Sequence, residues 1–247
     1  MTHLLSISNL SKSFGSLKVI DNFNIHLNSG EALGIIGPNG AGKSTLFNLI
    51  TGTLIADRGN IIFLGKDLTR SPAYSRCRAG IGRSYQIPHP FSGMTVFENL
   101  LVGAAFGGQE KESRTYAYCK EILDLTGLIN KANTLAGSLT LLERKRLEMA
   151  RALATKPQIL LLDEIAGGLT EHEVDELIGT IRNIHSQGTS IIWIEHIVHA
   201  LMSVVERLVV INFGQKLSEG NPEKVFNSSE VQKVYMKVVK IKKGPYK

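Results

Sequence analysis

Nine consecutive residues have the types and spacing needed to hold phosphate groups. Residues 37–45 (GPNGAGKST) fit the pattern G-x-x-x-x-G-K-[ST] at every specified position. The glycines let the backbone curl so that successive N–H groups point at phosphate oxygens. Lys43 would supply a positive charge to the β- and γ-phosphates, and Ser44 a hydroxyl to Mg²⁺. The residues assigned to this nucleoside triphosphate site are Gly37, Pro38, Asn39, Gly40, Ala41, Gly42, Lys43, Ser44 and Thr45.

Carboxylates follow an apolar run later in the chain. Residues 159–162 (ILLL) read as a buried strand, and Asp163 and Glu164 come directly after it. A phosphate-loop protein needs a carboxylate at the end of such a strand to bind its metal. We therefore expect Asp163 to orient Mg²⁺ or its water shell. Glu164 would lie beside the attacking water and act as general base.

Two further polar residues end strands of the same kind. His196 follows the apolar residues 190–194 and Glu195, so it would reach the γ-phosphate from a neighbouring strand. Gln86 closes the last predicted strand before a helical region and is placed to contact Mg²⁺ or water. We therefore predict a catalytic set of Lys43, Gln86, Glu164 and His196, and a metal set of Ser44, Gln86 and Asp163.

The elements that position these residues fall into three regions. Residues 1–86 contain short apolar strands and a helix after the phosphate loop, and residues 158–247 again alternate strands with helices. Between them, residues 87–157 show only helical periodicity, over residues 96–105, 114–126 and 141–154. Apolar strands that alternate with helices predict an α/β fold with a parallel sheet covered on both faces and ligands at the carboxyl ends of its strands. The expected organisation is one nucleotide-binding core, 1–86 and 158–247, with an inserted helical subdomain.

The composition agrees with a globular protein of the cytosol. The chain has 247 residues, 43% of them hydrophobic, and a formal net charge of +6. It contains no run of about twenty apolar residues, and its N-terminus lacks the features of a signal peptide. Cys77 and Cys119 stand alone, which indicates reduced thiols. Five lysines near the C-terminus read as a solvated tail or as a contact for an anionic surface: Lys237, Lys240, Lys242, Lys243 and Lys247.

The phosphate loop, Gln86, the acids after residues 159–162 and His196 follow one another in an order that resembles the ATP-binding subunit of an ABC transporter, and the resemblance extends over nearly the whole chain. The resemblance implies a P-loop NTPase core, with a mixed, mainly parallel sheet flanked by helices and an antiparallel β portion, plus a helical subdomain. It implies ATP and Mg²⁺ as cofactors, with the Walker A motif at residues 37–45, the Q-loop at Gln86, the Walker B motif at residues 159–164 and the switch histidine at His196. Phe14 matches the aromatic residue that stacks on adenine, although one more core aromatic is the alternative.

Residues 83–86 (RSYQ), 93–104 (GMTVFENLLVGA) and 194–196 (IEH) look like the subunits that serve uptake of branched-chain amino acids and urea. Two segments depart from the family pattern. The signature LSGGQ should fall at Leu139, Thr140, Leu141, Leu142 and Glu143, where both glycines are replaced. A leucine at position 142 would have to point away from a partner's γ-phosphate. In the D-loop, Thr170 stands where Asp is common, and Ile165 replaces a common Pro.

The resemblance also implies partners. Two such subunits pack head to tail, so that each ATP lies between the Walker A of one and the signature of the other. The altered signature would weaken a partner's site, while the chain's own set is intact, and this favours a heterodimer without excluding a homodimer. Membrane permease subunits are the other expected partners, with a solute-binding protein involved indirectly and no nucleic acid. Residues 87–91 (IPHPF) are either a contact for a permease helix or ordinary packing of the insertion.

The resulting prediction is an ATPase that energises an importer of a small polar solute, branched-chain amino acids or urea-like compounds, located in the cytoplasm at the inner face of the cell membrane. Two alternatives remain open: a regulatory subunit that hydrolyses little ATP, and a soluble ABC ATPase not linked to transport. A turnover assay separates the first alternative from the prediction, and the single cassette without sustained heptads argues against the second.

Overall fold

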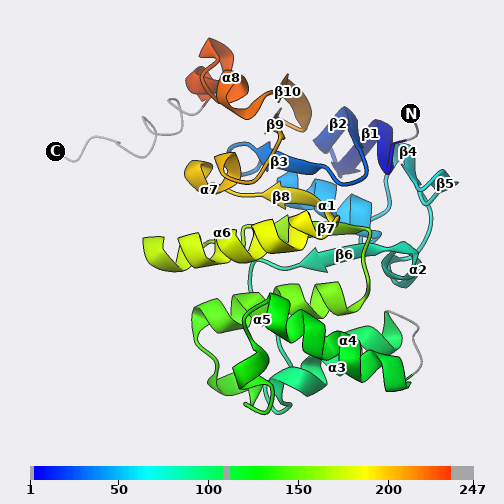
Figure 1. The fold of residues 1–247 in the computed structure, drawn as a ribbon. Coiled ribbons are helices and arrows are strands. Elements are labelled where there is room, and N and C mark those ends of the chain that lie inside the picture. The colour runs from blue at the N-terminus through cyan, green and yellow to red at the C-terminus, as the bar shows by residue number, and fades with distance from the viewer. Residues whose placement is uncertain (1–2, 108–111, 235–247) are drawn as a thin grey trace.

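The computed structural model describes residues 3–107 and 112–234, and the C-terminal lysines named above lie outside these ranges. Two sheets form the core (Figure 1). One has four strands in the order β2-β1-β4-β5, and all its neighbouring strands are antiparallel. Its strands are β1 (Leu5–Phe14), β2 (Leu17–Leu27), β4 (Arg58–Phe63) and β5 (Lys66–Asp67).

The second sheet has six strands in the order β10-β9-β3-β8-β7-β6. All its neighbours are parallel except β10 and β9, which form an antiparallel pair. Its strands are β3 (Ala32–Ile36), β6 (Ile81–Ser84), β7 (Ile159–Asp163), β8 (Ser190–Ile194), β9 (Arg207–Asn212) and β10 (Gln215–Gly220). The fold is therefore α/β with a mixed, mainly parallel sheet, as the sequence predicts.

Successive residues of the parallel strands point to opposite faces, and different elements cover the two faces. Leu33, Ile35 and Leu161 belong to a core shared with α1 (Lys43–Thr51) and the antiparallel sheet. Leu162 and Trp193 belong to a core shared with three helices on the other face. These helices are α5 (Leu141–Ala154), α6 (Glu171–Ser186) and α7 (Val198–Met202). Because both faces are covered, β3, β7 and β8 are buried along their whole length, which explains their continuous apolar sequences.

The helical insertion joins two adjacent strands. The chain leaves the sheet after β6, passes through α3 (Val96–Phe106), α4 (Glu112–Leu125) and α5, and returns as β7 directly beside β6. Figure 1 shows these three helices packed together at one end of the molecule. The insertion therefore sits immediately beyond the carboxyl end of β6, where Gln86 lies.

Among the strands and α-helices of the described residues, four were not predicted from the sequence: β5, β10, α2 (Ala73–Ala79) and α8 (Pro222–Phe226). Their sequences are short and mostly polar. Arg76 of α2 is only 1% exposed, and its guanidinium donates to Leu49 O, Ile50 O, Thr69 O and Ser71 O at 2.6 to 3.1 Å. The α2 segment is thus held by a buried arginine that hydrogen-bonds the carboxyl-terminal end of α1, and not by an apolar face.

Candidate functional site

The phosphate loop lies between β3 and α1, and two of its glycines have no room for a side chain. Gly42 has φ 103°, and a Cβ there would lie 2.6 Å from Val19 O. A Cβ on Gly37 would lie 2.3 Å from Ile211 O. The loop is therefore pressed against β2 and β9, and its path depends on glycine at both positions.

Lys43 is the first residue of α1, and its side chain is buried at 5% exposure. Its ammonium donates to Gly37 O at 2.9 Å and Pro38 O at 3.2 Å. Burial lowers the pKa of Lys43, while the nearby Glu164 and Asp163 carboxylates oppose that lowering. The amine thus lies at the centre of the loop and within the electrostatic reach of both acids.

Glu164 follows β7 and adopts the left-handed conformation, with φ 45°, which is uncommon for a residue with a side chain. Its backbone N–H donates to Ile194 O at 2.8 Å. Its two carboxylate oxygens face different partners: Gln86 Nε2 donates to Oε2 at 2.8 Å, and His196 Nε2 lies 2.8 Å from Oε1. One carboxylate therefore joins the ends of β6, β7 and β8, because these strands are neighbours and parallel.

A cavity of about 220 Å³ brings the phosphate loop and this acid together. It is open to solvent, and its polar groups include the backbone of the loop. Its walls are formed by Val19, Asn39, Gly40, Gly42, Lys43, Ser44, Thr45 and Glu164. A phosphate chain held by the loop would share this cavity with the Glu164 carboxylate.

Asp163, the last residue of β7, lies beside the same site. Its Oδ2 accepts from Arg83 Nη2 at 2.7 Å, and both side chains are only 7% exposed. The structure gives Oδ1 no hydrogen-bond partner among the described residues. The predicted metal set of Ser44, Gln86 and Asp163 offers only oxygen donors, which suit a hard divalent cation, and its binding of Mg²⁺ stays a prediction.

Phe14 ends β1, and its side chain is 48% exposed, so the alternative of a core aromatic is wrong. Lys12 Nζ lies 5.7 Å from the centre of its ring. The exposed ring is available to stack on a flat ligand, and stacking on adenine stays a prediction.

The predicted signature segment begins α5. Thr140 is the N-cap, and its hydroxyl and the Glu143 carboxylate form a capping box. Leu142 points into the core at 7% exposure, as its size requires, whereas Leu141 is 41% exposed. A methyl group on Gly168 would lie 3.4 Å from Leu141 Cδ2, so Leu141 lies over the loop that follows Glu164. Leu141, and not Leu142, is thus the exposed replacement for a family glycine.

Thr170 caps α6 in the same way, with Glu173 as the acid of its capping box. Asp and Thr are both good N-cap residues, so Thr170 preserves the local role of the common Asp. Ile165 is fully buried.

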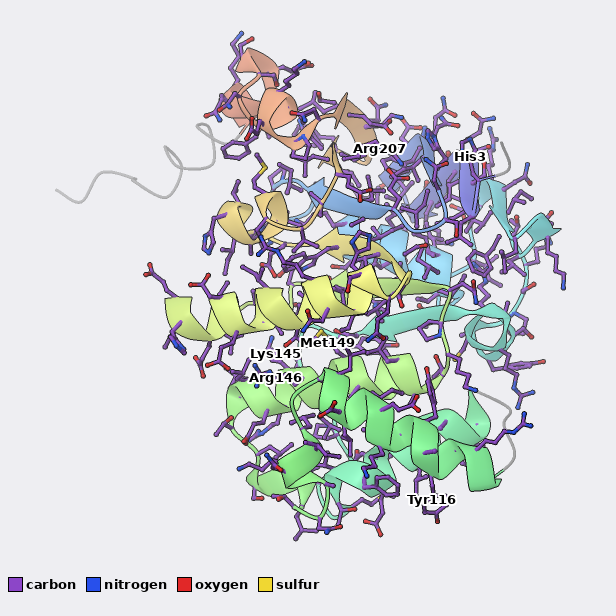
Figure 2. All side chains as sticks on the ribbon, viewed as in Figure 1. His3, Tyr116, Lys145, Arg146, Met149 and Arg207 are labelled. Atoms are coloured by element: carbon purple, nitrogen blue, oxygen red, sulfur yellow. The ribbon has the colours of Figure 1, made fainter. Side chains whose placement is uncertain are left out.

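Sequence reasoning gave no role to Lys145 and Glu195, which are among the buried charged residues around the site. Lys145 of α5, labelled in Figure 2, is 3% exposed, and its ammonium donates to Gln86 O at 2.8 Å. Burial lowers the pKa of Lys145, and the carboxylates of Glu195 and Glu164 oppose that lowering. Glu195 accepts from His196 N at 2.8 Å and from Ala166 N at 3.0 Å, so it ties the β8 end to the loop after Glu164. The position of Glu195 at a strand end was the available signal, whereas nothing in the sequence marks Lys145 among the other charges of α5.

Comparison with known proteins agrees with this arrangement. The family model described as "ABC transporter" matches residues 20–167. The chain is 37% identical to the high-affinity branched-chain amino acid transport ATP-binding protein LivG of Escherichia coli K12, over 94% of the chain and 97% of the relative. It is 32% identical, over the same shares, to the lipopolysaccharide export system ATP-binding protein LptB of Haemophilus influenzae.

A crystal structure of the ADP conformation of MJ1267, an ATP-binding cassette of an ABC transporter, matches with a TM-score of 0.88 and 31% identity, over 96% of this chain and 99% of that one. No helix among residues 3–107 and 112–234 has the length and apolar character needed to span a membrane. The chain belongs to the ABC transporter family, as an ATP-binding subunit and an ATPase that works with membrane components.

Proposed function

We propose that this ATPase is one of two ATP-binding subunits of an importer for branched-chain amino acids or urea-like solutes. The observation that carries the catalytic part is the meeting of Gln86 and His196 on the two oxygens of Glu164, beside the phosphate-loop cavity. The observation that supports the solute class is the 37% identity to LivG over 94% of the chain.

In the proposed reaction the loop residues 37–45 hold the phosphates, and Lys43 contacts the β- and γ-phosphates. Glu164 takes a proton from the attacking water as general base, while His196 hydrogen-bonds the γ-phosphate. Gln86 orients the water, and its contact with Glu164 lets movement of the helical insertion change the alignment of the base. Phe14 stacks on adenine.

The metal set fits Mg²⁺ because Ser44, Asp163 and Gln86 offer one hydroxyl, one carboxylate and one amide oxygen. Mg²⁺ in such sites keeps several waters and needs only one or two protein groups besides the phosphates. When bound, it would neutralise charge that develops on the transferred phosphoryl group.

The proposed permease contact lies beside Gln86. Ile87 is 64% exposed and Phe91 44% exposed. A neighbouring groove of about 360 Å³ is lined by Tyr74, Tyr85 and Val102, among others. Arg151 joins the two features, because it lines the groove, donates to His89 O at 2.9 Å and lies 5.0 Å from the Phe91 ring. An amphipathic permease helix would bury this apolar surface.

We further propose that the second ATP-binding subunit is a different chain. The residues around this chain's own phosphate loop match the family pattern, whereas Leu141 presents an exposed side chain where a partner's γ-phosphate needs close backbone approach. A partner with an intact signature would complete the site built on Glu164. The assembly would lie at the inner face of the cell membrane, with this chain in the cytoplasm.

Export is the second candidate, because the chain is also 32% identical to LptB. The same ATPase geometry serves either direction, so only a transport measurement separates the two candidates.

The experiment is to reconstitute the chain with its permease and partner subunits in vesicles and to measure ATP hydrolysis and labelled leucine and urea uptake together. Glu164→Gln should lower turnover about 10² to 10⁴-fold, which is the usual contribution of a general base, and should stop uptake while ATP still binds. Glu171→Gln, an exposed acid at the start of α6, is the control and should behave as wild type. Full turnover in Glu164→Gln would refute the catalytic assignment, and transport of neither solute in an active ATPase would refute the solute class.

A further inference from the structure

Arg83 is a charged residue of β6, the edge strand of the six-stranded sheet, and the motifs described above assign it no role. Its side chain is 7% exposed. Nη2 donates to Asp163 Oδ2 at 2.7 Å, and Nη1 donates to Asn48 Oδ1 at 2.6 Å. The guanidinium therefore bridges the end of β7 to α1, with one nitrogen for each.

Two aromatic rings hold the same guanidinium. Its central carbon lies 4.7 Å from the centre of the Tyr85 ring and 5.6 Å from that of Phe47. Phe47 belongs to α1 and is fully buried, whereas Tyr85 is 44% exposed and precedes Gln86. Arg83 thus contacts a buried ring of α1 on one side and a partly exposed ring on the other.

The bridge to α1 also fixes the position of the Asp163 carboxylate relative to Ser44, another residue of the predicted metal set. Ser44 and Asn48 are four residues apart in α1, so they lie on the same face of that helix, one turn apart. A carboxylate that is tied through Arg83 to Asn48 is therefore also placed relative to the Ser44 hydroxyl. Because Arg83 holds Oδ2, the other carboxylate oxygen, Oδ1, is left without a hydrogen-bond partner among the described residues and is available to a cation.

We infer that Arg83 is the positioning residue of Asp163: its planar fork fixes the metal-directed carboxylate relative to α1, and the Tyr85 ring keeps the fork in place. This inference rests on the proposed role of Asp163 toward Mg²⁺. Tyr85 and Arg83 also line the groove proposed for the permease. One side chain therefore connects the docking groove to the metal-directed acid, separately from the Gln86–Glu164 contact.

Charge alone does not explain the arrangement. A lysine at position 83 would keep the positive charge but lose the planar fork that serves Asn48 and Asp163 together and the stacking on Tyr85. Replacing groups that orient a metal ligand typically lowers metal affinity about 10 to 100-fold. A cation–π contact at an exposed site contributes about 0.5–1 kcal/mol, which corresponds to a two- to fivefold change in affinity.

The test measures Mn²⁺ binding to the full chain saturated with ADP, by electron paramagnetic resonance, together with the ADP affinity in EDTA. The variants are Arg83→Lys, Tyr85→Ala and Tyr85→Phe. Arg78→Lys is the matched control, because Arg78 stacks on Tyr74 at 5.9 Å on the rim of the same groove but has no contact with Asp163.

Arg83→Lys should weaken Mn²⁺ binding about tenfold or more, and Tyr85→Ala two- to fivefold, with ADP affinity in EDTA unchanged. Tyr85→Phe and Arg78→Lys should match wild type. Wild-type Mn²⁺ affinity in Arg83→Lys, or an equal loss in Arg78→Lys, would overturn the inference. If Arg83→Lys does not fold, equal Mn²⁺ affinities in Tyr85→Ala and Tyr85→Phe would overturn it. If the wild-type chain does not bind ADP in EDTA, the proposed nucleotide site itself would be refuted.

Discussion

Leu141 and Leu142 are neighbours in the first turn of α5, yet glycine substitutions at the two positions should have very different costs. Leu142 is 7% exposed and packs in the core with α5, α6 and the sheet, whereas Leu141 is 41% exposed. Removing a buried leucine down to alanine costs about 2–5 kcal/mol, including the cavity that remains. The further step to glycine adds up to about 1 kcal/mol at either position.

We therefore expect Leu142→Gly to lower the free energy of unfolding by about 3–5 kcal/mol, and Leu141→Gly by about 1–2 kcal/mol, since over a third of that side chain is already in water. For a chain of this size each kcal/mol shifts Tm by about 2–4 °C. The two variants should thus differ by about 2–16 °C in Tm, and urea midpoints should rank in the same order.

The helix propensity cost of glycine is common to both variants, so the difference between them isolates burial. Leu141→Ala and Leu142→Ala repeat the comparison without that cost. Equal loss of stability at the two positions would contradict the burial difference on which the assignment of Leu141 as the exposed signature residue depends.

Three other predictions follow from single contacts. Lys43→Met removes the charge that would meet the β- and γ-phosphates and should weaken ATP binding about tenfold or more, as measured with a fluorescent nucleotide; unchanged affinity would exclude Lys43 from the site. Arg76→Met leaves buried carbonyl oxygens such as Leu49 O without a donor and should lower the free energy of unfolding by about 3 kcal/mol or more, measured in urea, whereas a wild-type midpoint would contradict that role. Burial, with the Arg207 guanidinium and His3 nearby, lowers the pKa of His26, so the unfolded chain binds that proton more tightly. Stability should therefore fall as the pH drops below about 6.5, and the His26→Gln variant should lose part of this fall; identical pH profiles would refute the contribution.

The convergence of Gln86, Glu164 and His196 could be predicted because parallel strands bring their carboxyl ends to one edge of the sheet. The structure adds that Gln86 and His196 each lie two residues beyond the strand end, in the turns after β6 and β8. The boundaries of α5 were also predicted, because the helical periodicity over residues 141–154 coincides with the helix. The structure adds the Thr140–Glu143 capping box at its start.

Other features depend on contacts between distant segments, which a single sequence does not reveal. Apolar strand signals do not tell which strands pair, so the antiparallel β portion was expected only from the family resemblance, and its strands β1, β2, β4 and β5 were not identified from the residues. Arg83 reads as an isolated charge in an apolar strand until Asp163, 80 residues later, is placed beside it. The short α2 is stabilised through Arg76 and not through an amphipathic face, so periodicity carries no signal for it.

The departures from the family pattern can be explained by comparing what the local structure of this chain requires at each position with what a partner subunit would require there. At positions 140 and 170 the chain needs N-cap residues, and threonine fulfils that need in place of serine or aspartate. At position 141 the first turn of α5 makes no demand for glycine, because Leu141 is accommodated on the surface of a well-capped helix. Whatever requires glycine there must lie outside this chain, and in a head-to-tail pair it is the nucleotide held by the partner. In the heterodimer proposed above, the two composite sites are therefore unequal: Glu164→Gln in this chain should remove the turnover of the site that uses the partner's signature, while glycine at position 141 should improve only the other site.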